Sequence, residues 1–140
     1  MALAIKRFCR IEKLEVFRND AKELVDATKQ TTFIKLPPIL VINFKYFGSK
    51  TGNSAKLKKI MPLETKIKVS KQNYELFAII FHFGESIHGG HYETEAFHSE
   101  KWHLYSDQDV KVISSPSFTS NDKTRVPYLL FYKHEYLQAV

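Results

Sequence analysis

The stretch at residues 73–83, NYELFAIIFHF, limits the fold of this chain more than any other part of the sequence. Apolar residues fill both alternate sets of positions, whereas a strand with one solvated face alternates apolar and polar residues. A strand of this kind is covered on both faces. We therefore expect residues 73–83 to form a strand whose two faces are both covered.

Other segments rich in β-branched and aromatic residues follow at short spacing and indicate further strands. They are PPILVINFKYF (37–47), HYETEAF (91–97), KWHLYSDQDVKVI (101–113) and VPYLLFYKHEYL (126–137). The charged, proline-interrupted residues 59–69 favour an edge strand or an irregular segment, and residues 48–56, GSKTGNSAK, are typical of a loop. The expected fold class is mainly β (α+β): an antiparallel sheet of about five to seven strands, or a half-barrel, with a short N-terminal helix.

The helix is expected at residues 18–30, RNDAKELVDATKQ. Its residues Ala21, Leu24, Val25 and Thr28 follow helical spacing, and Asp20 with Glu23 resembles a capping box. Residues 1–17 alternate apolar and basic residues, which indicates one or two short strands before the helix.

Composition narrows the functional classes. A chain of 140 residues has the size of one domain, and its net charge of +6 comes from scattered lysines, with only KLKK at 56–59 resembling a cluster. A basic β-sheet module for nucleic acid is therefore the weaker alternative, because such modules carry a concentrated basic stripe. No apolar run is long enough for a signal peptide or a membrane span, so we expect no membrane partner.

Cys9 is the only cysteine of the sequence. It excludes an intramolecular disulfide and a zinc site built from thiols. A reducing, intracellular location in the cytoplasm or nucleus fits this composition best.

The segment GESIHGGHYETEAF at residues 84–97 places Gly89 and Gly90 between two histidines, His88 and His91. A glycine pair permits positive φ or the close approach of another chain. A histidine directly after such a turn lies at a rim, which is the usual place for proton-transfer chemistry. The alternative is a hairpin turn flanked by two solvated imidazoles.

Strand register predicts a partner for His91. If residues 98 and 99 form a two-residue turn, His91 lies opposite Ser106, and a three-residue turn places Asp107 there instead. Either oxygen would fix the tautomer and orientation of the imidazole. The alternative is a histidine with a polar neighbour on a solvated sheet face.

Metal binding is the other chemistry that the histidines suggest. His82, His88, His91 and His103 lie close in sequence, but no familiar ligand spacing accompanies them. His82 stands between Phe81 and Phe83, where a structural histidine is more usual. We expect neither a metal site nor a cofactor.

Four segments together resemble the ubiquitin-specific proteases, the USP class of papain-like deubiquitinases. LPPILVINFKYF (36–47) resembles their LPxxLxxxLKRF strand, and YELFAIIFHFGESIHGGHY (74–92) resembles their histidine box. WHLYSDQDV (102–110) is similar to the WxxFDDxxV strand, and VPYLLFYKH (126–134) to the closing AYxLFYxR strand. The resemblance is strongest over residues 27–133, and residues 1–140 are expected to be one partial catalytic domain, its C-terminal half.

The resemblance implies roles for individual residues. His91 matches the general base, Ser106 falls where most members have Asp or Asn, and Asp107 matches an acidic residue that assists. The tail of ubiquitin would pass over His88, Gly89 and Gly90 beside Tyr92. The implied partners are ubiquitin or ubiquitinated proteins.

The nucleophile of the family is missing from the pattern. Members carry it in an N-terminal Cys box with an Asn or Gln that supplies the oxyanion donor, and the surroundings of Cys9, KRFCRIEK, do not resemble that box. We therefore expect Cys9 to be a small structural residue within a strand.

Two functions remain open. The chain is the C-terminal half of an active deubiquitinase whose Cys-box half lies on another segment or chain and acts as a partner, or it is an inactive, truncated module that binds ubiquitin or another protein. The isolated chain is expected to be inactive in either case.

Overall fold

The computed structural model describes residues 2–44, 63–86, 89–118 and 124–137. It contains one helix, α1 (Ala2–Phe8), and a hairpin of two strands, β1 (Glu12–Arg18) and β2 (Leu24–Lys29), in this part of the chain. The main sheet consists of β3 (Ile39–Asn43), β4 (Lys66–Val69), β5 (Gln72–Ser86), β6 (Gly89–His98), β7 (Lys101–Ser106), β8 (Asp109–Ile113) and β9 (Arg125–His134).

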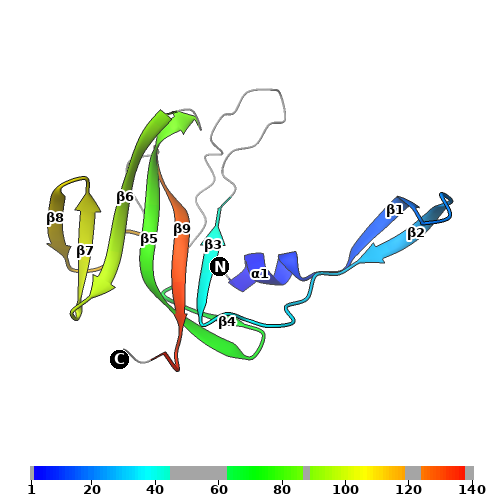
Figure 1. Cartoon of the computed structure of the whole chain (residues 1–140), viewed down its shortest axis with the longest axis horizontal. Coiled ribbons are helices and arrows are strands. Elements are labelled where there is room, and N and C mark those ends of the chain that lie inside the picture. Colours follow the sequence, from blue (N-terminus) through cyan, green and yellow to red (C-terminus); the bar gives the residue numbers. More distant parts are fainter. Residues whose placement is uncertain (1, 45–62, 87–88, 119–123, 138–140) are drawn as a thin grey trace.

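Across the described residues the main sheet is seven-stranded with the order β3-β9-β5-β6-β7-β8, and β4 pairs with β5 beside this path. All of its pairs are antiparallel. The hairpin β1–β2 projects away from this sheet, beyond α1 (Figure 1). The predicted fold class, a mainly β protein with an antiparallel sheet and a short N-terminal helix, is confirmed.

The strand predicted for residues 73–83 is β5. It pairs with β9 through Tyr74–Leu76 and with β6 from Ala78 onward, so it has neighbours on both sides. Among the described strands, β4 pairs with β5 alone, and it buries Ile67 and Val69 while its lysines stay exposed, as expected of an edge strand. The predicted loop at 48–56 lies outside the described residues.

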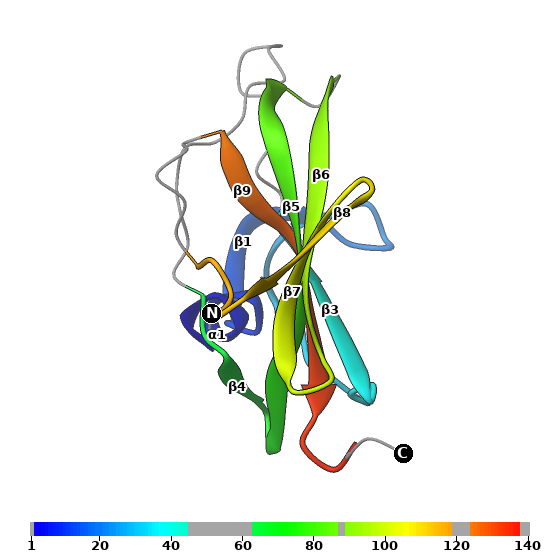
Figure 2. The same cartoon turned by 90° about the vertical axis from the view of Figure 1, so that its left-hand side faces the viewer.

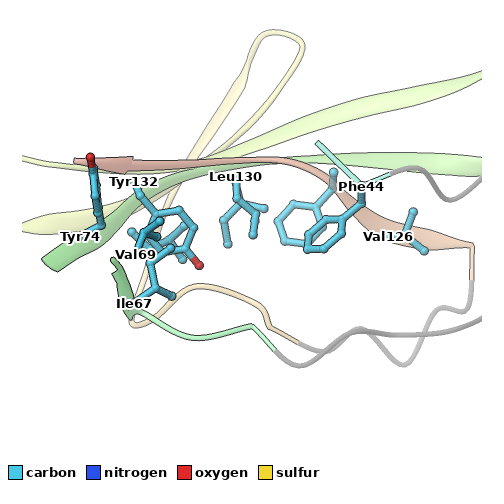
Figure 3. Packing of buried hydrophobic residues seen from close by; sticks show 10 residues of the cluster. Phe44, Ile67, Val69, Tyr74, Val126, Leu130 and Tyr132 are labelled. Carbon is cyan, nitrogen blue, oxygen red and sulfur yellow. The ribbon is translucent and has the colours of Figure 1, made fainter. Parts of the chain in front are cut away.

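The core lies on the side of the sheet that α1 and β4 cover (Figure 2). Ile5 of α1 packs against it. The polar ends of its tyrosines are satisfied, because the Tyr132 hydroxyl donates to Glu64 O at 2.7 Å and the Tyr74 hydroxyl to Pro37 O at 2.6 Å. Figure 3 shows the buried cluster, which comprises Phe44, Ile67, Val69, Tyr74, Leu76, Ile79, Phe81, Val126, Leu130 and Tyr132.

The helix predicted for residues 18–30 is wrong, since these residues form the turn and second strand of the β1–β2 hairpin. Asn19 explains the difference. Its carbonyl accepts the amide of Lys22 at 2.9 Å, its side-chain Oδ1 accepts the amide of Glu23 at 2.9 Å, and Lys22 has a φ of 66°. This turn chemistry outweighs the helical spacing of the apolar residues that follow.

The helix lies earlier, at Ala2–Phe8, where one or two strands were expected. Within residues 1–17, the expected strand is found only from Glu12 onward, where β1 begins. Among the described residues, no helix is both long and apolar enough to span a membrane.

Candidate active site

His91 lies near the start of β6 and is half-buried. It is the cross-strand partner of Phe83 on β5, and the centres of the two rings are 6.1 Å apart. Its Nε2 lies 2.9 Å from the hydroxyl oxygen of Ser106, the last residue of β7. The structure therefore brings together the histidine and the serine that register and resemblance singled out.

The observed register between β6 and β7 nevertheless differs from both predicted ones, by two residues for the two-residue turn at 98 and 99 and by one for the three-residue turn. The turn is at Ser99 and Glu100, with φ of 47° and 62°, and His98 pairs with Lys101. The sequence of this turn, HSEK (98–101), contains no Asn-Gly or Gly-Gly pair that would have predicted it. The ring of Phe97 packs on its cross-strand partner Trp102 at 5.7 Å between centroids, which favours the observed register.

In the observed register the contact between His91 and Ser106 is diagonal. The ladder of β6 and β7 runs from His98↔Lys101 to Thr94↔Tyr105, so continuing it by one residue sets Ser106 opposite Glu93, two positions from His91. Diagonal neighbours in an antiparallel pair lie within reach of long side chains. The imidazole spans this distance and reaches Ser106 with Nε2, its far nitrogen.

This geometry assigns the two ring nitrogens different tasks. When Nε2 carries the proton, it donates to Ser106 Oγ, and Nδ1 keeps a lone pair that can accept a proton from a thiol. Ser106 is half-buried, and its turn is closed by the pair Ser106↔Asp109. The hydroxyl is thus held on a two-residue turn between β7 and β8.

Asp107 lies at the first position of that turn, with a φ of 50° and an exposed side chain. In the described part of the chain, the side chain bonded to His91 is that of Ser106. The geometry therefore favours Ser106 over Asp107 as the residue that orients the imidazole.

The two glycines before His91 differ in their surroundings. A Cβ on Gly90 would lie 2.0 Å from the carbonyl oxygen of Phe83 and 2.5 Å from His82 Nε2, whereas one on Gly89 would meet nothing within 4 Å. Gly90 is therefore required by the close approach of β6 to β5. Gly89 leaves open space, and His88 lies outside the described residues.

Tyr92 follows His91 in a strand, so its side chain lies on the opposite face of β6. It is 54% exposed, and its ring packs on His82 at 4.9 Å and on Tyr128 at 5.8 Å between centroids. A contact of the Tyr92 ring with a substrate would therefore lie on the face away from the imidazole.

The histidines that the structure describes do not converge on one point. His82 is buried on the face of the sheet on which Tyr92 lies. His91 contacts Ser106, and His103 stacks on His98 with 3.9 Å between ring centroids. No group of three or more His, Cys, Asp or Glu that suits a metal is found among the residues that the structure describes.

Cys9 is half-buried and follows α1 rather than lying within a strand, which corrects that expectation. The helix lies beside β3, as the groove that they line together shows, and β9 and β5 separate β3 from β6 (Figure 1). Cys9 therefore does not face His91.

A buried charged cluster next to His91 was missed at the sequence level. Glu93 and Glu95 share the face of β6 on which His91 lies, and both contact Arg125, the first residue of β9. Strand alternation predicts the shared face of His91, Glu93 and Glu95. The arginine comes from a strand that is not adjacent to β6, so no sequence signal pointed to it.

The fold and this site define a mainly β domain in which a histidine near the start of one strand is hydrogen-bonded to a serine at the end of the neighbouring strand. The family model described as "Ubiquitin carboxyl-terminal hydrolase" matches residues 7–132, and the chain belongs to this family.

Curated relatives agree with the family assignment. Ubiquitin carboxyl-terminal hydrolase 10 of Mus musculus is 30% identical over 93% of this chain and 19% of its own length. Ubiquitin carboxyl-terminal hydrolase 3 of Saccharomyces cerevisiae is 27% identical over 93% of this chain and 18% of its own length. The chain thus spans about a fifth of the length of these relatives.

Solved structures also match. The SAGA DUB module Ubp8(C146A)/Sgf11/Sus1/Sgf73 bound to monoubiquitin contains a chain that is 26% identical, with a TM-score of 0.77 over 94% of this chain and 31% of that one. The Ubp8/Sgf11/Sus1/Sgf73 module bound to ubiquitin aldehyde gives 27% identity and a TM-score of 0.76, over 94% and 32%.

Proposed function

We propose that this chain is the base-bearing part of a cysteine-type deubiquitinase. His91 is the general base, Ser106 orients it, and Asp107 stays in the turn as an accessory acidic residue. The observation that carries this proposal is the 2.9 Å contact between His91 Nε2 and Ser106 Oγ, in a chain that belongs to the ubiquitin carboxyl-terminal hydrolases.

The nucleophilic thiol comes from outside these 140 residues. Cys9 follows α1, which lies beside β3, and β9 and β5 lie between β3 and β6, whereas a base acts within hydrogen-bond reach of the proton it takes. The partner that completes the site is therefore a Cys-box segment, which also brings the oxyanion donor.

The chemistry divides between the two parts. His91 Nδ1 accepts the thiol proton, and the thiolate attacks the terminal carbonyl carbon of ubiquitin. The imidazolium then gives its proton to the leaving lysine amine as the C–N bond breaks. Water, deprotonated by His91, attacks the thioester, which releases the ubiquitin carboxylate and returns the proton to the thiolate.

The ubiquitin tail lies along the start of β6. Gly89 is exposed and has open space where a side chain would stand, which suits an extended tail against the backbone. Gly90, His88 and Tyr92 flank this path in the sequence. The matched Ubp8 structures with bound ubiquitin support ubiquitin as the partner.

The test combines binding and labelling. The chain is mixed with a Cys-box segment of a matched relative and with ubiquitin that carries a thiol-reactive group at its C-terminus, and covalent ubiquitin adducts are counted by mass spectrometry. Adducts that require both this chain and His91 support the proposal, with His103→Ala as the control that leaves them unchanged.

Other outcomes decide against the proposal. Ubiquitin binding without adduct formation in any mixture would instead favour an inactive, ubiquitin-binding module. Adducts that form equally with His91→Ala would remove His91 from its role.

A further inference from the structure

Arg125 joins three strands beneath the candidate site. Its Nε lies 3.3 Å from Glu93 Oε2, and its Nη2 lies 2.8 Å from Glu95 Oε1. The guanidinium carbon lies 3.4 Å from the centre of the Phe81 ring. Because β5 lies between β9 and β6 (Figure 1), Arg125 crosses β5 to reach the two carboxylates.

This cluster is buried. The side chains of Arg125, Glu93 and Glu95 are 8%, 18% and 1% exposed. The second oxygen of Glu95 accepts the amide of Ser117 at 2.6 Å, so the carboxylate is held from two directions. Buried ion pairs are weak contributors to stability, since apolar residues of similar volume often serve as well. A role in holding geometry is their better-attested use.

Among the described residues, the backbone at His91 has a ladder partner on one side only. Residues 91–93 pair with β5, whereas the ladder with β7 begins at Thr94. Two glycines precede His91, and the register of β5 and β6 shifts between Phe83 and Ser86. The strand therefore lacks a second ladder where the imidazole must meet Ser106.

We propose that Arg125 is a positioning residue for His91. Its ion pairs with Glu93 and Glu95 hold the His91 face of β6 in the orientation in which Nε2 lies within hydrogen-bond distance of Ser106 Oγ. Glu93 and Glu95 lie two and four residues after His91, on the same face of β6. Arg125 itself does not contact the imidazole in this scheme. The inference deepens the proposed function, because it concerns the residue proposed as the base.

The contact itself provides the readout. In the isolated chain, the 15N resonances of the two His91 ring nitrogens report whether Nε2 is bonded to Ser106. The Ser106→Ala variant supplies the reference spectrum for the lost bond. Arg125→Met, which keeps length and apolar contact with Phe81, is expected to move the His91 resonances more than half of the way to that reference.

A matched control separates positioning from stability. Tyr132→Phe removes a buried hydrogen bond on a different part of β9, and it is expected to lower stability while the His91 resonances stay at their original values. Arg125→Lys keeps the positive charge but loses the planar guanidinium that bonds both carboxylates, and it is expected to shift the His91 resonances by an intermediate amount.

The inference is overturned if Arg125→Met folds and the His91 resonances do not move. If Arg125→Met does not fold, Arg125→Lys and Glu93→Gln decide, and unchanged resonances in both overturn it. No catalysis is needed for this measurement, so a failure of ubiquitin labelling would reject the proposed function while leaving the coupling between Arg125 and His91 measurable.

Discussion

Replacing Gly90 by alanine tests the close approach of β6 to β5. The new Cβ would lie 2.0 Å from Phe83 O, about 1.4 Å short of ordinary contact at 3.4 Å, and this neighbour is backbone that cannot rotate away. The strands must therefore separate where His91 pairs with Phe83.

The magnitude follows from overpacking and lost bonds. Overpacking costs roughly 1–3 kcal/mol, and each backbone hydrogen bond opened beside it costs about 1 kcal/mol more. We expect Gly90→Ala to lower the free energy of unfolding by about 2–4 kcal/mol, which corresponds to a fall in Tm of about 10 °C for a domain of this size.

Gly89→Ala is the matched control, since its Cβ meets nothing within 4 Å. Reduced freedom of the unfolded chain predicts an unchanged or slightly higher stability, by at most about 1 kcal/mol. Urea unfolding of the two variants under identical conditions makes the comparison. Equal stabilities would refute the reasoning, because the two substitutions would then share an environment that the structure says they do not share.

Further predictions concern three residues, Tyr132, Ser106 and Asn19. Tyr132→Phe should lower stability by about 1–2 kcal/mol in urea unfolding, because a buried donor to Glu64 O is lost. Burial, and secondly the charge of Glu64, raises the pKa of Tyr132 above its usual value. The free energy of unfolding should therefore be maintained up to about pH 10 and should fall at higher pH. The fall with pH should be shallower in Tyr132→Phe, and equal slopes would contradict this. Ser106→Ala should slow hydrolysis at the C-terminus of ubiquitin by the completed enzyme about tenfold, the rate equivalent of one lost hydrogen bond of about 1.4 kcal/mol, and Ser106→Asp should not, since a carboxylate gives a charge-assisted bond; an unchanged or faster Ser106→Ala enzyme would argue against orientation by Ser106. Asn19→Ala should speed amide exchange at Glu23, whose N–H it leaves without its Oδ1 acceptor, and unchanged exchange would show that the turn does not depend on Asn19.

The sequence could predict elements whose pattern is local. Apolar residues on both parities of 73–83 predicted a strand with both faces covered, and β5 buries residues of both parities, among them Leu76 and Ile79. The hairpin at residues 12–29 could not be predicted in this way, because the apolar residues of 18–30 fit helical spacing and the decisive bonds of Asn19 are formed only in the folded turn.

For the site, the closeness of His91 and Ser106 was easier to predict from the sequence than the geometry of their contact. Alternation along β6 and the short turn bring His91 near Ser106 both in the register predicted from a two-residue turn at 98 and 99 and in the observed one, which differ by two residues. The position of Arg125 depends on a crossover between distant strands, which spacing alone does not encode. The reason for Gly90 is likewise a contact with β5 that only the paired strands reveal.

The most direct test is the rate at which the chain, completed by a Cys-box segment, releases a fluorophore from the C-terminus of ubiquitin. His91→Gln should reduce this rate at least about 100-fold, as expected for the loss of a general base, while ubiquitin binding is retained. His103→Gln, a matched substitution at the histidine that stacks on His98, should leave the rate within about twofold. Equal rates for the two variants would contradict the assignment of His91 as the base.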